Sequence, residues 1–169
     1  MSDKNQSEEN PDPLEHVKTQ ISEQFKKAFN DLLVENLNSD TPNVEWLKRL
    51  YMELRDRICG LTPRRQDLIK EVHETMDVDF FCQLVENKVF DSKSLYGLVD
   101  YIFTKIKQLE APVKNKITEQ KFNEILEVAN QENASMATII PVFLANAHER
   151  LDDVYTDRDA FLEFMKNKK

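Results

Sequence analysis

The chain has 169 residues, of which 40% are hydrophobic and 32% are charged, and its formal net charge is −8. This length suits a single domain that buries roughly two thirds of its unfolded surface. The excess of 31 acidic over 23 basic residues argues against general nucleic-acid binding, because phosphate contacts need a basic face. No run of 18 apolar residues and no apolar leader occurs in the sequence, so we expect no membrane span and a cytoplasmic or nuclear protein.

The low glycine content points to helices. Only 2 glycines are present, against an average of about 7% in proteins, which leaves few positions for tight hairpins and argues against an all-β fold. The two cysteines, Cys59 and Cys82, form no disulfide framework and are expected to be reduced thiols.

Residues 1–12 are polar and charged and contain proline, which predicts a disordered acidic tail before a single helical domain at 13–169. The first helix is predicted from about Leu14 to Leu37, since its apolar residues recur every three or four positions. The second helix is predicted to open at Thr41-Pro42, and Gly60 is expected just past its end, where a positive φ is tolerated. Its buried face, which Trp46 and Leu50 widen, comprises Val44, Leu47, Tyr51, Leu54 and Ile58.

The sequence LTPRRQDL has the features of a helix start, with Thr62 as N-cap and Pro63 as the first helical residue. This start places Arg64 and Arg65 in the first turn, where unpaired N–H groups make cations unfavourable. Two explanations stay open. Either Arg64 pairs with Asp67 and Arg65 with an acid on a neighbouring helix, or the two guanidinium groups form a fork for an acidic or phosphorylated partner.

A short fourth helix is predicted after Asp77 or Asp79, and it carries the adjacent aromatic residues Phe80 and Phe81. Aromatic residues at helical spacing are most simply core residues. Adjacent residues cannot both point inward on one narrow stripe, which leaves open that one of the two phenylalanines lines a groove or an interface.

A fifth helix is predicted from Asp91-Ser92 to about Ala111, and a sixth from Thr118 to Asn130. The seventh begins near Asn133 and contains Pro141, where we expect a kink or a break because proline removes a hydrogen bond and clashes one turn back. A last apolar set follows, on the same helix or on a short eighth one: Val154, Tyr155, Phe161, Phe164 and Met165.

The predicted fold is therefore all-α, a compact bundle of seven or eight helices without a β-sheet. No catalytic or metal-binding pattern stands out in the sequence. The histidines His16, His73 and His148 are not spaced as metal ligands, and the acids from Asp152 to Asp159 lack the glycine and closing glutamate of an EF-hand. We predict that the protein is not an enzyme and has no catalytic residues, no metal and no cofactor.

Two long segments, LTPRRQDLIKEVHETMDVDFFCQ and FDSKSLYGLVDYIFTKIKQLEAPVKN, resemble the T-complex protein 11 family, as do the Met136-Ala137 pair and Tyr155 with Phe161. The resemblance implies an all-α, non-enzymatic protein. Family members are associated with cyclic-AMP and protein-kinase-A signalling and, in animals, with sperm function.

Two features depart from that family's pattern. Members usually have several hundred residues, so this chain resembles a minimal, single-domain version. Glu110, Lys114 and Asn115 stand around the Ala-Pro-Val element, where the family commonly has a Cys and an Arg-Asp pair.

The leading hypothesis is a helical interaction protein that binds a kinase or its regulatory subunit through Arg64, Arg65, Phe80 and Phe81. The alternative is a structural or assembly component, virus-encoded in one version, that forms a homo-oligomer through helix faces. A helix-in-groove binder of the apoptosis-regulator type is a third reading. That reading requires a wholly apolar central helix, whereas the predicted fifth helix is amphipathic.

Overall fold

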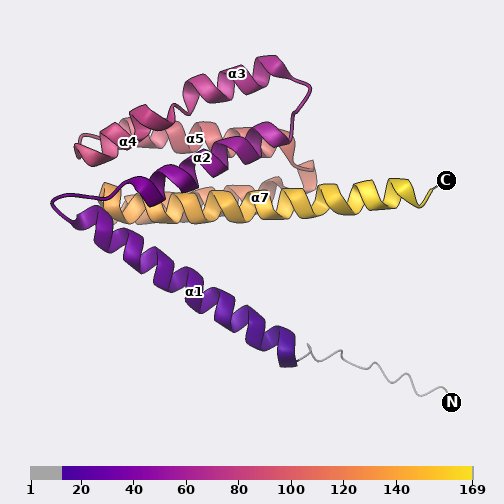
Figure 1. The fold of residues 1–169 in the computed structure, drawn as a ribbon, viewed down its shortest axis with the longest axis horizontal. Helices are drawn as coiled ribbons and strands as arrows, with labels where there is room; N and C mark the ends of the chain where they lie inside the picture. The colour runs from indigo at the N-terminus through magenta and orange to yellow at the C-terminus, as the bar shows by residue number, and fades with distance from the viewer. Residues whose placement is uncertain (1–12, 169) are drawn as a thin grey trace.

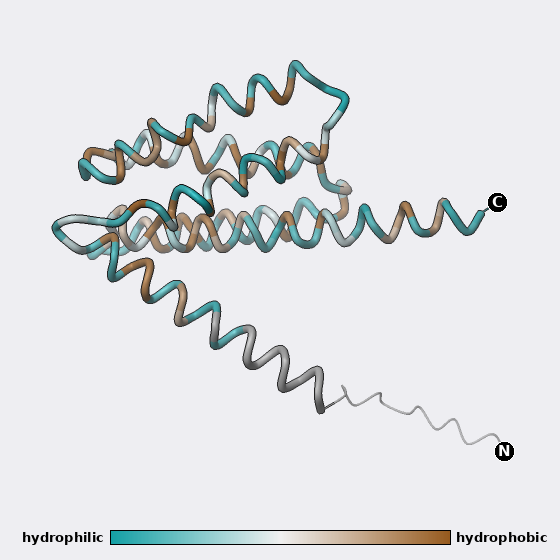
Figure 2. Tube along the Cα trace, in the orientation of Figure 1, coloured by the Kyte–Doolittle hydropathy of each residue, from teal (hydrophilic) through white to brown (hydrophobic). Residues whose placement is uncertain are grey.

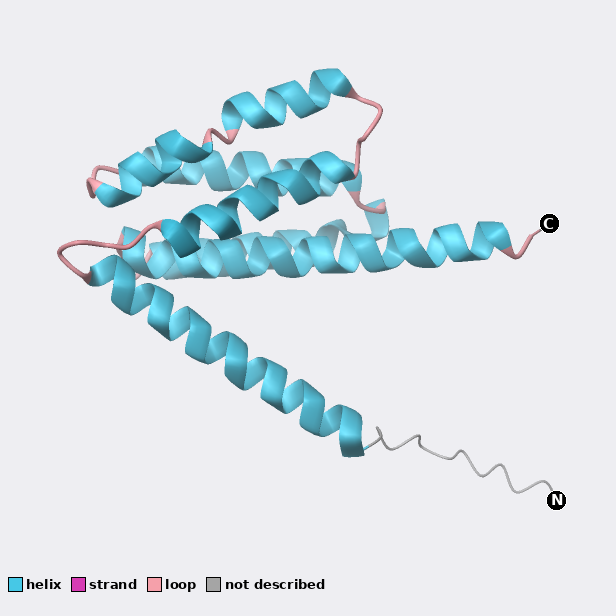
Figure 3. Ribbon diagram, viewed as in Figure 1, coloured by secondary structure: helices cyan, strands magenta, loops and turns pink. Residues whose placement is uncertain are grey.

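The computed structural model describes residues 13–168, and every regular element in this range is helical (Figure 3). The predicted all-α fold of seven or eight helices is thus confirmed for the described residues. The tail predicted at residues 1–12 lies outside them. The elements are α1 (Pro13–Asn38), α2 (Glu45–Gly60), α3 (Gln66–Thr75), α4 (Val78–Glu86), α5 (Ser92–Leu109), the 3₁₀ turn η1 (Pro112–Lys114), α6 (Asn115–Ala129) and α7 (Met136–Lys166).

α7 is the axis of the fold, because α1, α2, α5 and α6 all pack against it (Figure 1). Its buried residues recur at helical spacing, so that one helix presents apolar side chains to several neighbours. α3 and α4 pack chiefly against α2. The arrangement therefore places α7 between α1 on one side and the remaining helices on the other (Figure 1).

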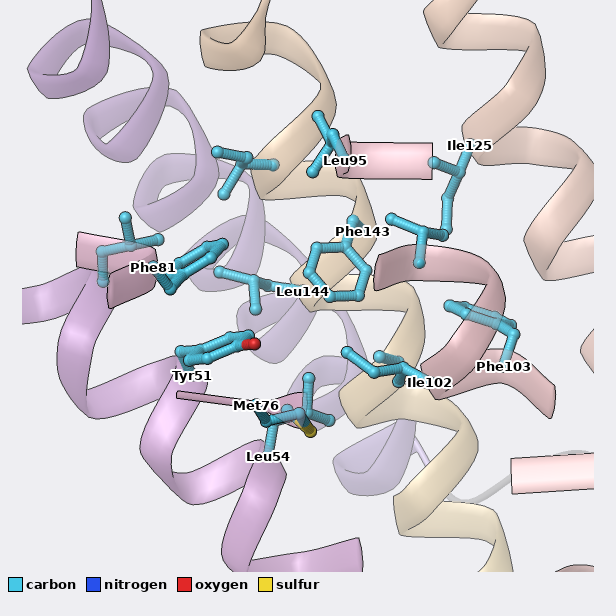
Figure 4. Close-up of a cluster of buried hydrophobic side chains, with 14 of the residues drawn as sticks. Tyr51, Leu54, Met76, Phe81, Leu95, Ile102, Phe103, Ile125, Phe143 and Leu144 are labelled. Carbon is cyan, nitrogen blue, oxygen red and sulfur yellow. The ribbon is translucent and has the colours of Figure 1, made fainter. Parts of the chain in front are cut away.

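The core is made of aliphatic and aromatic side chains contributed by every α-helix, and among the largest fully buried ones are Tyr51, Phe103 and Phe143. Figure 4 shows Phe143 and Leu144 of α7 between Tyr51 of α2 and Ile125 of α6. Burying each such side chain stabilises the fold by about 1.5–3 kcal/mol.

Two predicted caps are confirmed by hydrogen bonds. The Asp77 carboxylate accepts from the backbone N–H of Phe80 at 3.0 Å and begins α4. The Asp91 carboxylate accepts from the backbone N–H of Ser94 at 2.7 Å and begins α5. Both bonds satisfy a donor that the first helical turn leaves unpaired.

The predicted start of α2 at Thr41-Pro42 is wrong, since the helix begins at Glu45. The side chain of Asn36 holds the connection in a non-helical form. Its Nδ2 donates to the carbonyl of Asn43 at 2.6 Å, and its Oδ1 accepts from the backbone N–H of Asn43 at 3.0 Å. These two bonds, which we call the Asn36–Asn43 clamp, outweigh the local preference for a helix start.

The prediction that Gly60 follows α2 with a positive φ is also wrong. Gly60 is the last residue of α2, and no described glycine has a positive φ. Its small size matters instead, because an added Cβ would lie 2.5 Å from the Tyr155 hydroxyl. That hydroxyl donates to the carbonyl of Arg57 at 2.6 Å. Gly60 therefore allows the end of α2 to dock closely on α7.

Of the kink or break expected at Pro141, the break does not occur, because α7 runs through this residue as one helix of 31 residues (Figure 1). The first intrahelical hydrogen bond of α7 joins the N–H of Ile139 to the carbonyl of Ser135 at 3.0 Å. Pro141 is the sixth residue of α7, so it removes one hydrogen bond, to the carbonyl of Ala137, just after the first turn. The last apolar set thus lies on α7 itself.

α7 extends beyond the helices that pack on it, and we call residues 156–166 the α7 arm (Figure 1). Val154 is the last buried residue of the helix, and every side chain of the arm is exposed. The arm nevertheless carries Phe161, Leu162, Phe164 and Met165, whose exposed fractions are 48–61%. Apolar residues therefore recur along a helix that contacts little else (Figure 2).

Candidate protein-interaction surface

The double arginine lies in the connection between α2 and α3. The predicted helix start at Thr62 and Pro63 is wrong, since α3 begins at Gln66. Residues 62–65 form a turn in which the N–H of Arg65 donates to the carbonyl of Thr62 at 3.1 Å. Proline suits the second position of such a turn. Both arginines precede the first residue of α3, but Arg65 is its N-cap and lies at the helix end that disfavours cations.

Arg65 pairs with Asp67 through two hydrogen bonds, Nε to Oδ1 at 3.0 Å and Nη2 to Oδ2 at 2.8 Å. These bonds lower the pKa of the Asp67 carboxyl to about 2. The predicted pairing of Arg64 with Asp67 is wrong, because Arg65 occupies that carboxylate. Arg64 is exposed and makes no ion pair with the side chains that the structure describes. Of the two arginines, Arg64 is therefore the one available to an acidic partner.

The phenylalanine pair of α4 divides between core and surface. Phe81 is 2% exposed and stacks on Tyr51, with ring centroids 4.0 Å apart, whereas Phe80 is 58% exposed. Phe81 thus belongs to the core (Figure 4), and we correct its assignment as a partner-binding residue. Phe80 remains accessible.

The structure does not bring Phe80 and Arg64 together. α4 and the α2–α3 connection lie at opposite ends of the molecule (Figure 1). α3 lies between them in the chain, and a helix of 10 residues spans about 15 Å. The candidate partner-binding residues Arg64 and Phe80 therefore do not share one surface.

A site that the sequence did not predict lies between α1 and α2. It is a hollow of about 250 Å³, which we call the Trp46 hollow, lined by Phe29, Leu32, Leu33, Asn36, Asn43 and Trp46. Leu33 is buried, while Leu32 and Trp46 are more than half exposed. The rings of Phe29 and Trp46 lie 5.5 Å apart, tilted by 40°. An apolar concavity with a tryptophan at its rim has the properties of an interface anchor pocket.

The Asn36–Asn43 clamp makes this hollow a preformed feature. The clamp joins the end of α1 to the loop before α2, and the Asn43 side chain also accepts from the N–H of Glu45 at 3.1 Å. A surface that is already ordered loses less conformational entropy on binding. Helical spacing predicts that Trp46 lies at the edge of the buried face of α2. The sequence therefore does not indicate that its side chain is exposed.

A polar cluster is buried where α5, η1, α6 and α7 meet. Arg150 and Glu110 have side chains that are 4% and 1% exposed, and Arg150 Nη2 lies 3.0 Å from Glu110 Oε2. The Thr118 hydroxyl donates to Glu110 at 2.6 Å and accepts from Arg150 Nε at 3.0 Å. Arg150 also donates to Asp153 at 2.8 Å. Both charges are thus satisfied inside the protein, which identifies the cluster as a tie between helices.

The hydrogen bond from Arg150 lowers the pKa of the Asp153 carboxyl below its usual value. A lowered folded-state pKa adds stability above the unfolded value near 3.9, and this stability is lost as the pH falls through the folded-state pKa. We expect Asp153→Asn to reduce the free energy of unfolding by about 0.5–1 kcal/mol at pH 7. The difference in unfolding free energy between Asp153→Asn and wild type should disappear below about pH 4. Urea unfolding at several pH values measures this difference.

Asp100→Asn is the matched control, because Asp100 is exposed and makes no ion pair with the described side chains. The difference in unfolding free energy between this control and wild type should not shrink as the pH falls. A gap for Asp153→Asn that stays constant down to pH 3 would contradict the assignment of the pKa shift to Arg150.

Two classes of feature are absent from the described part of the chain. No group of three or more His, Cys, Asp or Glu side chains there is arranged to hold a metal ion. No described helix combines the length and the apolar character needed to cross a membrane.

Comparison with known proteins places this fold in a family. No solved structure matches the chain. The family model of T-complex protein 11 matches residues 3–143, a range that includes the Trp46 hollow, the arginine turn and Glu110 of the buried cluster. The match covers most of the 169 residues, and the chain therefore belongs to the T-complex protein 11 family.

Proposed function

We propose that this chain is a non-enzymatic interaction protein that binds a signalling partner, and that the Trp46 hollow receives an apolar side chain of that partner. The observation that carries the proposal is the hollow itself, with its exposed tryptophan and its preformed walls. Tryptophan is enriched among the residues that dominate binding energy at protein interfaces.

The chemistry of the hollow favours binding over catalysis. Its lining consists of aromatic, aliphatic and amide side chains and includes no titratable group. General acid–base catalysis needs such a group within reach of the substrate. The buried pair Glu110–Arg150 is paired internally, which leaves neither member available for proton transfer.

The partner class follows from the family resemblance and is a kinase of the cyclic-AMP pathway or its regulatory subunit. The net charge of −8 favours a partner segment in which basic residues flank the apolar anchor. A cytoplasmic or nuclear location is part of this proposal.

The test measures binding of the purified catalytic and regulatory subunits of cyclic-AMP-dependent protein kinase to the immobilised chain. We expect one subunit to bind and Trp46→Ala to weaken it at least tenfold, since removing an anchor residue costs about 2 kcal/mol or more. Val89→Ala is the control, because Val89 is similarly exposed and lies outside the hollow.

Two results would revise the proposal. Binding by neither subunit would exclude this partner class. Binding that survives Trp46→Ala but is lost in Arg64→Ala would place the interaction surface at the arginine turn. Binding that is lost in Phe80→Ala instead would place it at α4.

A further inference from the structure

The arginine turn, residues 62–65 between α2 and α3, contains a pattern that the Trp46 hollow does not explain. These residues read Thr-Pro-Arg-Arg. A hydroxyl residue followed by proline, with a basic residue three positions after the hydroxyl, is the pattern that proline-directed protein kinases recognise. Thr41-Pro42 is the only other place in the sequence where proline follows a hydroxyl residue, and Val44 stands there at the basic position. The complete pattern therefore occurs once.

The structure presents the arginine turn at one end of the molecule (Figure 1). Pro63, Arg64 and Arg65 are exposed and Thr62 is half-buried, so that none of the four belongs to the buried core. The Thr62 hydroxyl makes no hydrogen bond with the residues that the structure describes. Two backbone bonds hold the turn, from the N–H of Thr62 to the carbonyl of Cys59 and from the N–H of Arg65 to the carbonyl of Thr62, both at 3.1 Å. Breaking these two bonds lets the turn extend into the active site of a kinase.

The Thr41-Pro42 pair is held differently, although Thr41 itself is exposed. Pro42 is buried, and the Asn36–Asn43 clamp fixes the residue that follows it. Extending this segment would break the clamp and expose a buried proline. The structure thus separates the two Thr-Pro pairs in the same way as the basic residue does, and in favour of Thr62.

We propose that Thr62 is a phosphorylation site for a proline-directed protein kinase. In this step Oγ1 of Thr62 attacks the γ-phosphorus of ATP, the bond from that phosphorus to the β–γ bridging oxygen breaks, ADP leaves, and the hydroxyl proton passes to the catalytic base of the kinase. Pro63 has no backbone N–H, so it fits a substrate pocket that offers no acceptor at this position, where any other residue would bury an unpaired donor. Arg65 supplies the basic group. The site lies outside the Trp46 hollow and does not rest on the proposed function.

Arg64 is the residue that gains a partner from this modification. It lies two positions after Thr62, is exposed, and makes no ion pair with the described side chains, whereas Arg65 already bonds Asp67. A phosphate on threonine carries a charge of about −1.5 to −2 at pH 7 and three acceptor oxygens, two of which a guanidinium binds at once. Phosphorylation thus neutralises a basic turn on an acidic protein and withdraws Arg64 from acidic partners.

Incubation of the full chain with an active cyclin-dependent kinase and Mg²⁺–ATP tests the site, with intact mass and phosphopeptide mapping as the readout. Wild type should gain a single phosphate, on Thr62. Thr62→Ala should lose this incorporation, and Thr41→Ala, which changes the other Thr-Pro pair, should react like wild type. Arg65→Ala should slow the reaction about tenfold, because the kinase loses a charge-assisted contact. Arg49→Ala, which removes an exposed arginine of α2, should not slow it.

Phosphorus NMR of the phosphorylated chain tests the role of Arg64. The phosphate should become a dianion at lower pH in wild type than in Arg64→Ala, because a nearby guanidinium favours the more charged form, and Arg49→Ala should titrate like wild type. Trp46→Ala should be phosphorylated normally, which separates this site from the hollow. The proposal is overturned if Thr41 reacts as readily as Thr62, or if neither reacts under conditions that phosphorylate a standard substrate peptide. A titration unchanged by Arg64→Ala would overturn the assignment of the phosphate to Arg64.

Discussion

Replacing Arg150 by methionine is expected to reduce the free energy of unfolding by about 3–5 kcal/mol, because the Glu110 carboxylate would remain buried without its countercharge. Both side chains are almost fully inaccessible, and Glu110 would retain only the Thr118 hydroxyl of the bonds described. Small domains have a total stability of about 5–15 kcal/mol, so this one substitution removes a large share. Urea denaturation at pH 7, followed by circular dichroism, measures the loss.

The double variant Glu110→Met/Arg150→Met separates charge from packing. It removes both charges while keeping apolar volume, and buried ion pairs replaced in this way are often neutral or stabilised. We therefore expect it to regain most of the stability that Arg150→Met loses. If Arg150→Met costs less than about 1 kcal/mol, the cluster does not tie the helices together as described.

Phe81→Ala is expected to destabilise the fold by a comparable amount, about 3–5 kcal/mol. The substitution removes a ring that stacks on Tyr51 and meets the edge of Phe90, with centroids 5.5 Å apart. It also leaves a cavity between α2, α4 and the α4–α5 connection, and the surrounding helices collapse only partly around such a void. The same unfolding measurement detects the change.

The neighbouring residue provides a control of identical chemistry. Phe80→Ala should change stability by no more than about 0.5 kcal/mol, since Phe80 is exposed and its removal opens no cavity. Equal losses in the two variants would show that the division of the pair between core and surface is incorrect.

The helices themselves could be predicted from the sequence because their signal is local. Apolar residues at intervals of three and four mark each buried face, and the carboxylates of Asp77 and Asp91 cap α4 and α5 by bonding N–H groups three residues away. Such contacts form within one turn of helix, so neighbouring residues contain the required information.

The errors occur where distant contacts decide the local structure. The sequence predicts a positive φ at Gly60, the usual role of glycine at a helix end, whereas the structure shows that its small size lets Tyr155 approach. The sequence also predicts that α2 starts too early, because Asn36 on the preceding helix holds the loop in a non-helical form. No pattern among adjacent residues reveals either contact, since each joins separate elements of the fold.

The candidate site was predicted least well. The sequence singles out Arg64 and Phe80, and the structure leaves both exposed but apart, whereas Phe81 and Arg65 each have an internal partner. The exposure of Trp46 is not predicted, because helical spacing shows on which side of the helix a residue lies. It does not show whether another helix covers that side. The hollow exists only because α1 and α2 diverge around it, which is a property of their packing.

The central position of α7 also affects how the protein is made. α1 packs chiefly on a helix that is synthesised last among the described elements, so its apolar face lacks that partner while the intervening residues emerge. At about 5–20 residues per second, roughly 100 residues of delay correspond to about 5–20 s on the ribosome. During that interval the nascent chain displays the Leu33 and Leu37 face of α1, whereas α2 can already pack against α3 and α4.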